Sequence, residues 1–379
     1  MISDQRSIVL LGGAGVFGSR LTQLLARETD ANLIIAGRDI TKAQSLAREL
    51  GAGAKAAMLD RTRVAGASLA ALKPWAVVDC AGPFVGEDYQ FARTVIEAGA
   101  HYLDLSDGRA FAERFGALDA LARAHGVAAI CGASSTPALS SAVCDALTRD
   151  LVTVRSIEVS ISPGNRAPRG LAVVRSILGY AGKSVPLWRE GRWGSAPGWG
   201  LLTRKDMGDP VGWRWLSLCD APDLGLFPAR YKVSDRVIFR GGLELSVMHL
   251  GLSAASQLPR FGILPSLLPF SEMARDLADA LIGLGTDAGG MLVEIEGTDA
   301  GGKTVQRYWR LIAEAGVGPN VPVLAAFALL KRMLAGQKPE PGARPCLGEV
   351  PLTEFTPLFR MLNIRTETNA TAAAPVSAA

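Results

Sequence analysis

The feature that most constrains the fold is a regular alternation, along residues 1–135, between short apolar runs and segments with helical spacing. The runs have the length of buried strands, and the five helical segments lie near 18–28, 40–50, 66–72, 88–99 and 110–125. Strands joined by right-handed helical crossovers form a parallel sheet with helices on both faces. The alternation predicts a doubly wound α/β sheet with strands at 8–11, 33–37, 56–59, 76–82, 101–105 and 127–132.

A glycine-rich turn joins the first predicted strand to the first predicted helix. In GxGxxG spacing, the first glycine permits a tight turn, the second lets the backbone approach a pyrophosphate, and the third lets helix and strand pack closely. The helix start offers free N–H groups and partial positive charge to the phosphates. A Rossmann dinucleotide site is therefore predicted at Gly13, Ala14, Gly15, Val16, Phe17 and Gly18, with a plain turn beside an empty crevice as the alternative.

The end of the second predicted strand bears on which dinucleotide is bound. NAD enzymes carry an acidic residue there, which holds the ribose 2′-hydroxyl. This chain has Gly37 and Arg38, whose guanidinium suits a 2′-phosphate, and Lys42 adds charge, so NADP is favoured over NAD. Asp39 keeps NAD open, or it caps the next helix. Asp60, at the third strand end, is expected near the adenine, again with helix capping as the alternative.

Small residues follow the fourth predicted strand. Cys80, Ala81, Gly82 and Pro83 are expected to form the bed of the nicotinamide ribose, with Pro83 turning the chain outward. Cys80 is interpreted as an apolar filler rather than a reactive thiol. The turn at 132–137, after the sixth strand, offers amides to the nicotinamide or to a substrate carboxylate.

Candidate catalytic residues end the fifth predicted strand. Hydride transfer asks the protein mainly for positioning and for a proton or polarisation, because the cofactor carries the reagent. Tyr102, Asp104 and Ser106 face the predicted crevice and are the predicted catalytic residues, although Asp104 could instead bind loop amides. His101 starts the same strand at the opposite end, and His249 is expected in a strand as a half-buried sheet residue.

The pattern changes after Pro137 to longer alternating strands and glycine-rich loops. Strands are predicted at 156–162, 230–239, 242–253 and 290–299, the last forming a hairpin with 303–315, and a helix follows at 322–334. The second half is thus expected to be mixed α/β with a largely antiparallel sheet. The predicted units are a Rossmann domain at 1–135, a substrate and dimerisation domain at 136–320, a C-terminal helix and segment returning to the first domain at 321–362, and a flexible tail at 363–379.

Composition excludes several function classes. The chain has 379 residues with 40 basic and 36 acidic side chains, and the scattered charges give a net charge of +4, which argues against nucleic acid as a partner. Five widely separated cysteines without a CxxC pair favour reduced thiols and the cytoplasm over disulfides or a metal site. Neither a signal peptide nor a membrane-spanning run of about 18 apolar residues is expected.

Several of these stretches together resemble a known family. GGAGVFG, AGRD, VVDCAGPF, AGAHYLDLS and GASSTPALSS are similar to the NADP binding domain of the saccharopine dehydrogenase-like family, and the second half resembles bacterial members in PGARPCLGEVPLTEF. Relatives include saccharopine and carboxynorspermidine dehydrogenases and enoyl reductases that act on lipids. Two segments depart from the family pattern where substrate should bind, Ser106-Asp107-Gly108 and Ala133 to Pro137.

The resemblance implies an NADP-dependent oxidoreductase. Hydride would pass between nicotinamide and a C=N, C=O or C=C bond of a small or lipid-like substrate held between the domains. The alternative is a protein that binds NADP without turnover, as a sensor or scaffold.

Two apolar stretches bear on partners. Five tryptophans with interspersed cations fall within 188–215, which indicates a lid or dimer surface, or else a pocket for a large anionic substrate. The proline-broken segment 258–270 is too short to span a bilayer and is interpreted as a subunit contact in a homodimer, with a membrane surface as the less favoured partner.

Overall fold

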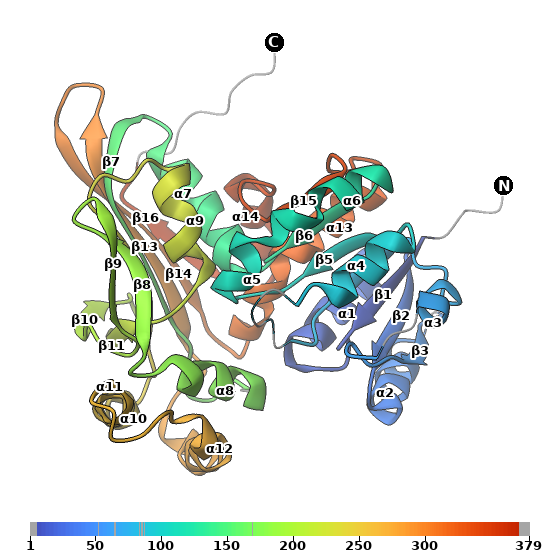
Figure 1. Cartoon of the computed structure of the whole chain (residues 1–379), viewed down its shortest axis with the longest axis horizontal. Coiled ribbons are helices and arrows are strands. Elements are labelled where there is room, and N and C mark those ends of the chain that lie inside the picture. Colours follow the sequence, from blue (N-terminus) through green and yellow to red (C-terminus); the bar gives the residue numbers. More distant parts are fainter. Residues whose placement is uncertain are drawn as a thin grey trace.

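The computed structural model describes residues 6–51, 53–63, 66–82, 84, 86, 88–168 and 170–370. Two seven-stranded sheets stand side by side, sheet A built mainly from the first half of the chain and sheet B from the second (Figure 1). Among the described residues, none of the helices combines the length and the apolar character needed to cross a membrane.

Sheet A confirms the predicted parallel sheet. Its strand order is β15-β6-β5-β4-β1-β2-β3, and every neighbouring pair is parallel. The predicted strands are β1 (Ser7–Leu11), β2 (Asn32–Gly37), β3 (Lys55–Met58), β4 (Ala76–Asp79), β5 (His101–Asp104) and β6 (Ala128–Cys131). The seventh, β15 (Gly342–Pro345), comes from the C-terminal segment and was not predicted.

Helices cover both faces of sheet A because successive strand residues point to opposite sides. On one face Ile8 and Leu10 pack with Leu21 and Leu25 of the first helix, and on the other Val9 and Leu11 belong to a separate apolar cluster. The helices of this half are α1 (Val16–Glu28), α2 (Ile40–Leu50), α3 (Gly66–Ala70), α4 (Gln90–Glu97), α5 (Arg109–Glu113), η1 (Phe115–Leu118) and α6 (Asp119–Ala124).

Sheet B is mixed, with order β10-β11-β12-β7-β13-β14-β16 and one parallel pair, β12 with β7. The predicted hairpin is confirmed as β13 paired antiparallel with β14. The strands are β7 (Leu151–Ser162), β10 (Thr203–Asp206), β11 (Trp213–Leu218), β12 (Arg236–Gly241), β13 (Gly289–Asp299), β14 (Thr304–Ala313) and β16 (Arg365–Thr368), and a separate hairpin pairs β8 (Ser184–Arg189) with β9 (Arg192–Pro197).

One strand prediction in the second half was correct only in part, and another was wrong. Residues 222–230 form helix α9 (Pro222–Arg230), so the strand expected at 230–239 begins only at Arg236. The strand expected at 242–253 is mostly helix α10 (Ser246–Ala255). Its outward face carries exposed Val247 and Leu250. Because the outward face of this helix is apolar too, its sequence lacks the polar side that identifies an amphipathic helix. The pattern therefore resembles that of an alternating strand.

The remaining helices are η2 (Ser135–Leu139), α7 (Ser140–Thr148), α8 (Leu171–Tyr180), α11 (Gln257–Arg260), η3 (Leu268–Phe270), α12 (Ser271–Ala280), η4 (Ile282–Leu284), η5 (Gly318–Val323), α13 (Leu324–Leu334) and α14 (Leu352–Met361). The predicted helix at 322–334 is confirmed as α13, whose residues are mostly buried. It packs on α1, and the Arg6 guanidinium donates to the carbonyl groups of Met333 and Leu334. One apolar cluster therefore runs from sheet A through α13 to sheet B.

The tail expected at 363–379 is ordered at its start. Residues 365–368 form β16, which pairs antiparallel with Trp309 to Ile312 of β14. A strand at the edge of a sheet is held by backbone hydrogen bonds and does not require apolar side chains. The low apolar content of this segment was therefore wrongly interpreted as a sign of disorder. Residues 371–379 lie outside the described residues.

Candidate functional site

The turn between β1 and α1 is held by backbone contacts that only glycine permits. Gly12 has φ +75° and its N–H donates to the Ala36 carbonyl at 2.7 Å. A Cβ on Gly12 would lie 2.9 Å from Cα of Ala81, and a Cβ on Gly18 would lie 2.1 Å from the Gly12 carbonyl oxygen. Gly12 was missed by the sequence analysis, although the extra glycine before GxGxxG was its signal.

The N-terminus of α1 is open. Gly15 occupies the N-cap position in extended conformation, without a side-chain cap and without an acidic residue in the first turn. The N–H groups of Val16, Phe17 and Gly18 form that first turn, where a helix has no carbonyl partner of its own. The backbone of Ala14 and of the exposed Gly15 lies directly before this first helical turn. The turn can therefore receive an anion at several amides at once.

Arg38 stands at the end of β2 as an exposed cation that pairs with no carboxylate in the described chain. The Asp39 carboxylate accepts the Lys42 backbone N–H at 3.2 Å, and its second oxygen lies 3.7 Å from Nζ of Lys42. Asp39 thus takes the capping role left open by the sequence, and the cation of Lys42 faces it. A Cβ on Gly37 would meet nothing within 4 Å, so space remains beside Arg38.

Asp60 forms a local turn after β3. Its carboxylate accepts the backbone N–H and the hydroxyl of Thr62, at 3.0 and 2.8 Å. These hydrogen bonds, with the charge of Arg38 among the smaller causes, hold the pKa of Asp60 below its ordinary value. The role near adenine stays a prediction, but the negative charge of Asp60 contributes to the field around Arg38.

Next to the glycine turn, β4 ends in a buried ion pair. Nε of Arg61 lies 2.7 Å from the Asp79 carboxylate, which also accepts the Ala81 N–H, and the guanidinium lies over the Phe84 ring. Burial raises the pKa of Asp79 in spite of Arg61. Cys80 is partly buried, and burial raises its thiol pKa, which agrees with an inert filler. Gly82 has φ +40°, and Pro83 lies outside the described residues.

The three predicted catalytic residues lie in the interior. Tyr102, Asp104 and Ser106 are each 0% exposed. One oxygen of Asp104 accepts the N–H groups of Ser106 and Gly132, at 2.9 and 2.7 Å, while burial raises its pKa to about 7. Tyr102 and Asp104 shift each other's pKa, yet no hydrogen bond of good geometry joins them. Asp104 ties the loops after β5 and β6 together, and the catalytic role of the three stays a prediction.

The turn after β6 contacts the second half of the chain. The Thr136 hydroxyl donates to the Asp223 carboxylate, which lies in the first turn of α9. Asp223 is fully buried, and burial raises its pKa to about 7. Pro137 packs on Gly132, where a Cβ would lie 2.5 Å from Cδ of the ring. The amides that were expected to hold substrate here are therefore close to a domain junction.

Several polar residues near the junction of the two halves were not among the predicted site residues. Asp107 lies in the loop between β5 and α5, where it is exposed. Tyr180 ends α8 and is partly exposed. Arg109 forms an ion pair with Asp220 at 2.7 Å and donates to the Pro186 carbonyl. The Ser106-Asp107-Gly108 departure was a signal for Asp107, whereas Tyr180 had none.

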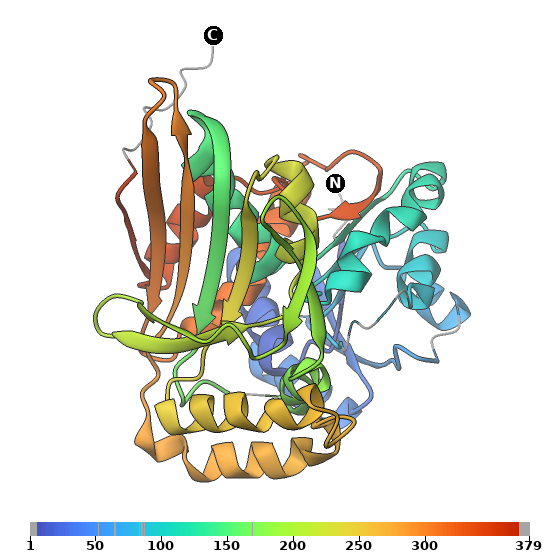
Figure 2. The same ribbon diagram turned by 60° about the vertical axis from the view of Figure 1, so that its left-hand side comes forward.

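A layer of helices, α10 to α12, lies below the strands of sheet B (Figure 2). We call its exposed apolar side chains the apolar helical surface, which comprises Val247, Leu250, Phe261, Ile263, Leu268, Phe270, Met273, Leu277, Ile282 and Leu284. These are ten of the sixteen large apolar side chains that are exposed among the described residues. The surface includes the segment predicted to contact another subunit.

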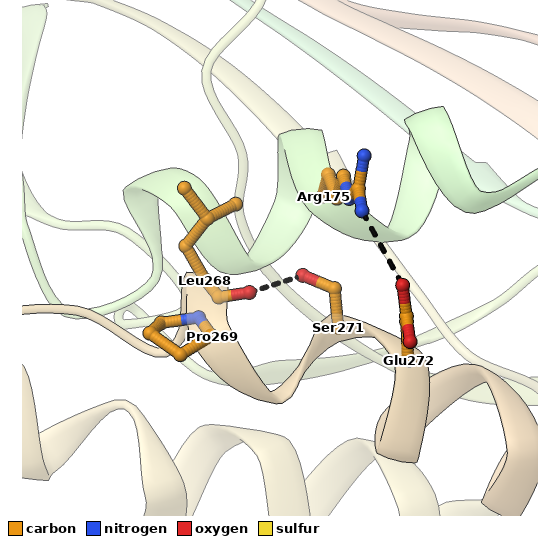
Figure 3. A pocket seen from close by; sticks show the side chains of 5 residues that line it. All are labelled: Arg175, Leu268, Pro269, Ser271 and Glu272. Carbon is orange, nitrogen blue, oxygen red and sulfur yellow. Dashed lines mark hydrogen bonds and ion pairs between the residues drawn. The ribbon is translucent and has the colours of Figure 1, made fainter.

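A cavity of about 400 Å³ lies in this layer between α8 and the start of α12. Figure 3 shows Arg175 and Glu272 facing each other, 3.5 Å apart, with Leu268, Pro269 and Ser271 completing the lining. The tryptophans of 188–215 do not gather there: Trp199 is buried beside His249, and the Trp188 indole donates to the Val233 carbonyl.

His249 itself is a buried helix residue that contacts the Ser217 hydroxyl, not a half-buried strand residue as expected. It lies in the helical layer because the segment folds as α10. Groups of three or more metal-ligating side chains placed to hold an ion are not found in the described part of the chain.

Comparisons with known proteins agree with this architecture. Residues 8–130 match the family model of the saccharopine dehydrogenase NADP binding domain. Saccharopine dehydrogenase (L-Glu forming) from Saccharomyces cerevisiae has a similar structure, with a TM-score of 0.67 and 16% identity over 96% of this chain and 100% of that chain. The amine dehydrogenase of Mycobacterium smegmatis is more distant, with a TM-score of 0.44 and 13% identity over 90% of this chain and 94% of that chain.

Curated protein sequences provide no match. The family model covers the part of the chain that holds the glycine turn, Arg38 and the ends of strands β1 to β5, while the structural likeness extends to the second half. Residues 8–130 of this chain are thus similar to the saccharopine dehydrogenase NADP binding domain, and the fold of the chain as a whole is similar to that of saccharopine dehydrogenase.

Proposed function

We propose that the protein is an NADP-dependent oxidoreductase. It transfers a hydride between nicotinamide and a C=N, C=O or C=C bond of a small or lipid-like substrate, bound between the two halves. The observation that carries this proposal is the turn before α1, where Gly12 and Gly18 pack backbone against backbone in front of an uncapped helix start. In doubly wound folds, ligands bind at this edge, where the strand order reverses between β1 and β4.

In this proposal, different segments of the chain bind different parts of the cofactor. The amides of the first turn of α1 suit the pyrophosphate, and the small residues 80–82 leave room for the nicotinamide ribose. When bound, the cofactor supplies the hydride, so the protein contributes orientation and a proton. The buried Arg61–Asp79 pair fixes the loop after β4 through the Phe84 ring and the Ala81 amide.

Arg38 selects the 2′-phosphate in this proposal. It is the exposed cation at the end of β2, whereas the neighbouring Asp39 is engaged by Lys42 at both oxygens. A guanidinium matches a phosphate with two parallel hydrogen bonds. An acidic residue that is already engaged as a helix cap is a poor partner for a ribose hydroxyl, and so NADPH is expected to bind more tightly than NADH.

The test is a fluorescence titration with NADPH and with NADH, supported by thermal shifts. Arg38→Ser should raise the dissociation constant for NADPH ~10-fold, about 1.4 kcal/mol, and leave NADH unchanged. Arg48→Ser is the control, because Arg48 is exposed on α2, the helix that follows Arg38, and its Nε donates to the Gln44 carbonyl. Gly15→Asp should abolish binding of both nucleotides. If parent and Gly15→Asp respond alike to NADPH, the dinucleotide site is refuted.

A second candidate function is NADP binding without turnover. The burial of Tyr102, Asp104 and Ser106 favours it, since none of these side chains is exposed to a ligand in the structure. Cofactor titration does not separate the two candidates. NADPH oxidation across a panel of imines, ketones and enoyl thioesters does, because a sensor protein binds NADPH and oxidises it with none of them.

A further inference from the structure

The cavity between α8 and α12 is a second candidate ligand site. Its volume of about 400 Å³ is at the lower end of the range, about 300–1,000 Å³, that holds small ligands. All five residues that line it belong to α8 or to the segment 268–272, in the second half of the chain. None of them takes part in the proposed dinucleotide site, which is built from the first half.

The inner wall of the cavity is fixed by packing. Ser271 is 2% exposed, and its hydroxyl donates to the Leu268 carbonyl at 2.5 Å. Leu267 and Ala278, before and after this turn, are also buried. Both α12 and η3 contact α8. Because the Ser271 hydroxyl is already engaged, the polar groups of the lining that a ligand can reach are the charged ends of Arg175 and Glu272.

These two charged side chains face each other at the rim. Nη2 of Arg175 lies 3.5 Å from Oε1 of Glu272, and the side chains are 56% and 69% exposed. An exposed ion pair of this kind contributes little to stability, because water and salt screen it and both side chains lose conformational freedom. A guanidinium also has more N–H donors than one such contact uses. A ligand can therefore separate the pair at little cost.

The opposite charges determine which class of head group fits. A simple anion is attracted by Arg175 and repelled by Glu272 from nearly the same distance, and a simple cation experiences the reverse. In both cases the two contributions largely cancel. A head group that carries both charges can place its anion beside Arg175 and its cation beside Glu272, so that both contacts are attractive.

Apolar side chains line the other end of the cavity. Figure 3 shows Leu268 and Pro269 on the far side of Ser271 from the ion pair. Leu268 is 45% exposed and belongs to the apolar helical surface, so the cavity adjoins that surface. A hydrocarbon chain that covers these side chains removes apolar area from water, which is favourable for each methylene buried. The lining therefore suits a charged head followed by an apolar chain.

We propose that this cavity binds a zwitterionic amphiphile, a single-chain molecule whose head carries one anionic and one cationic group. Arg175 binds the anionic group, Glu272 binds the cationic group, and Leu268 and Pro269 contact the chain next to the head. The volume suits a head group with a short chain. The site is independent of the proposed function, and so it is tested without NADPH.

The first test is calorimetric titration of the full chain with four probes that share an octyl chain, each below its micelle concentration. The probes are octylphosphocholine (zwitterion), octanoate (anion), octyltrimethylammonium (cation) and octyl glucoside (uncharged). Octylphosphocholine should bind about fivefold more tightly than each of the others, as expected from one additional exposed ion pair. Equal affinity for the four probes overturns the proposal.

The second test changes one charge at a time. Arg175→Gln should weaken octylphosphocholine about fivefold and strengthen octyltrimethylammonium, because Glu272 then faces the cation alone. Glu272→Gln should weaken octylphosphocholine equally and strengthen octanoate instead. A merely structural role of the ion pair would not reverse the preference between anion and cation.

Arg192→Gln is the matched control for these variants. Arg192 is an exposed arginine that lies 3.7 Å from a glutamate, Glu190, at the β8–β9 hairpin and outside the cavity lining. It should leave the affinities for all four probes unchanged. If Arg175→Gln and Glu272→Gln keep the order of the four probes found for the parent, the inference fails.

Vesicles distinguish a free amphiphile from a membrane lipid with the same head group. The parent should bind octylphosphocholine in solution and should not sediment with phosphatidylcholine vesicles. Protein that sediments with the vesicles but does not bind octylphosphocholine overturns the proposal, because the head group is then recognised only at a membrane surface. A failure of NADPH binding would refute the proposed function and leave these titrations unaffected.

Discussion

The two sheets of this protein differ in how they satisfy their polar groups. At the carboxyl edge of sheet A the backbone amides at the start of α1 are uncapped, and the exposed cation of Arg38 forms no ion pair with the described residues. Sheet B pairs its charges internally: Glu158 lies between Lys205, at 2.7 Å, and Arg240, at 2.5 Å. Open amides and an exposed cation can bind a ligand, and we propose the ligand site there, whereas the paired charges of Glu158 stabilise sheet B.

The glycines of the two regions show the same difference. Gly18 of α1 is enclosed by the Gly12 carbonyl, while Gly251 of α10 is exposed and a Cβ there would meet nothing within 4 Å. The first glycine is required by a close backbone approach, and the second has no comparable contact. Four predictions test this contrast between the glycine turn, for which we propose a ligand, and the packed second half of the chain.

The largest effect is expected for Gly18→Ala. The added methyl group would lie 2.1 Å from the Gly12 carbonyl oxygen, so the helix must move away from β1. We expect a loss of about 3 kcal/mol in the free energy of unfolding, measured in urea, and loss of NADPH binding. Gly116→Ala, with open space around it, is the control in the same half. A fully stable Gly18→Ala variant that binds NADPH would contradict the close-packed turn.

The second prediction concerns two buried carboxyl groups, Asp104 in the first half and Asp223 in the second. Both have a pKa of about 7, raised by burial. Because the folded pKa exceeds that of the unfolded chain, the stabilisation is complete at low pH and is lost as the pH rises from about 4 through about 7. Each group should contribute a slope of up to about 1.4 kcal/mol per pH unit.

Asparagine at either position cannot ionise and should remove its share of this slope, as measured by urea unfolding at a series of pH values. Asp104→Asn retains the oxygen that accepts both amides, and Asp223→Asn retains an acceptor for Thr136. A slope that is unaffected in both variants would show that these groups do not control stability near neutral pH.

The third prediction concerns the apolar helical surface. Met273, Leu277 and Leu284 are exposed along one side of α12 and η4. Charges of both signs flank them, including Arg275 and Asp276, which suits a second copy better than an anionic membrane. We propose that this surface closes a homodimer. Leu277→Glu should raise the dimer dissociation constant ~10-fold or more in sedimentation equilibrium.

Met58→Glu is the matched control, because Met58 is an exposed apolar side chain in the first half, outside this surface. It should leave the dimer unchanged. The dimer proposal would be contradicted if the parent protein is monomeric and binds neutral phosphatidylcholine vesicles, and if Leu277→Glu loses this binding. The partner of this surface would then be a lipid surface rather than a second copy of the chain.

The smallest effect is expected for Gly251→Ala. Alanine in the interior of a helix is about 0.5–1 kcal/mol more favourable than glycine, and the new methyl group meets no neighbour. The variant should be slightly more stable in urea unfolding and should bind NADPH as the parent does. A destabilised variant would show that α10 packs against another surface in solution.

Local sequence patterns were sufficient to predict those elements whose own residues show a clear strand, helix or turn pattern. The six parallel strands are buried along most of their length and alternate with amphipathic helices, so the order β1 to β6 could be predicted. The glycine turn was identifiable because its glycines are required by backbone contacts within a few residues. In α10 the signal failed, since an apolar outward face leaves no polar side to define the helical period.

The amino-acid sequence by itself determined the parallel sheet, the glycine turn and the cation at the end of β2, because each depends on residues that are neighbours along the chain. Only the tertiary structure decided that β15 extends sheet A and that β16 forms the last strand of sheet B. These contacts join residues far apart in the chain, and their free energy is gained only when the whole core has packed.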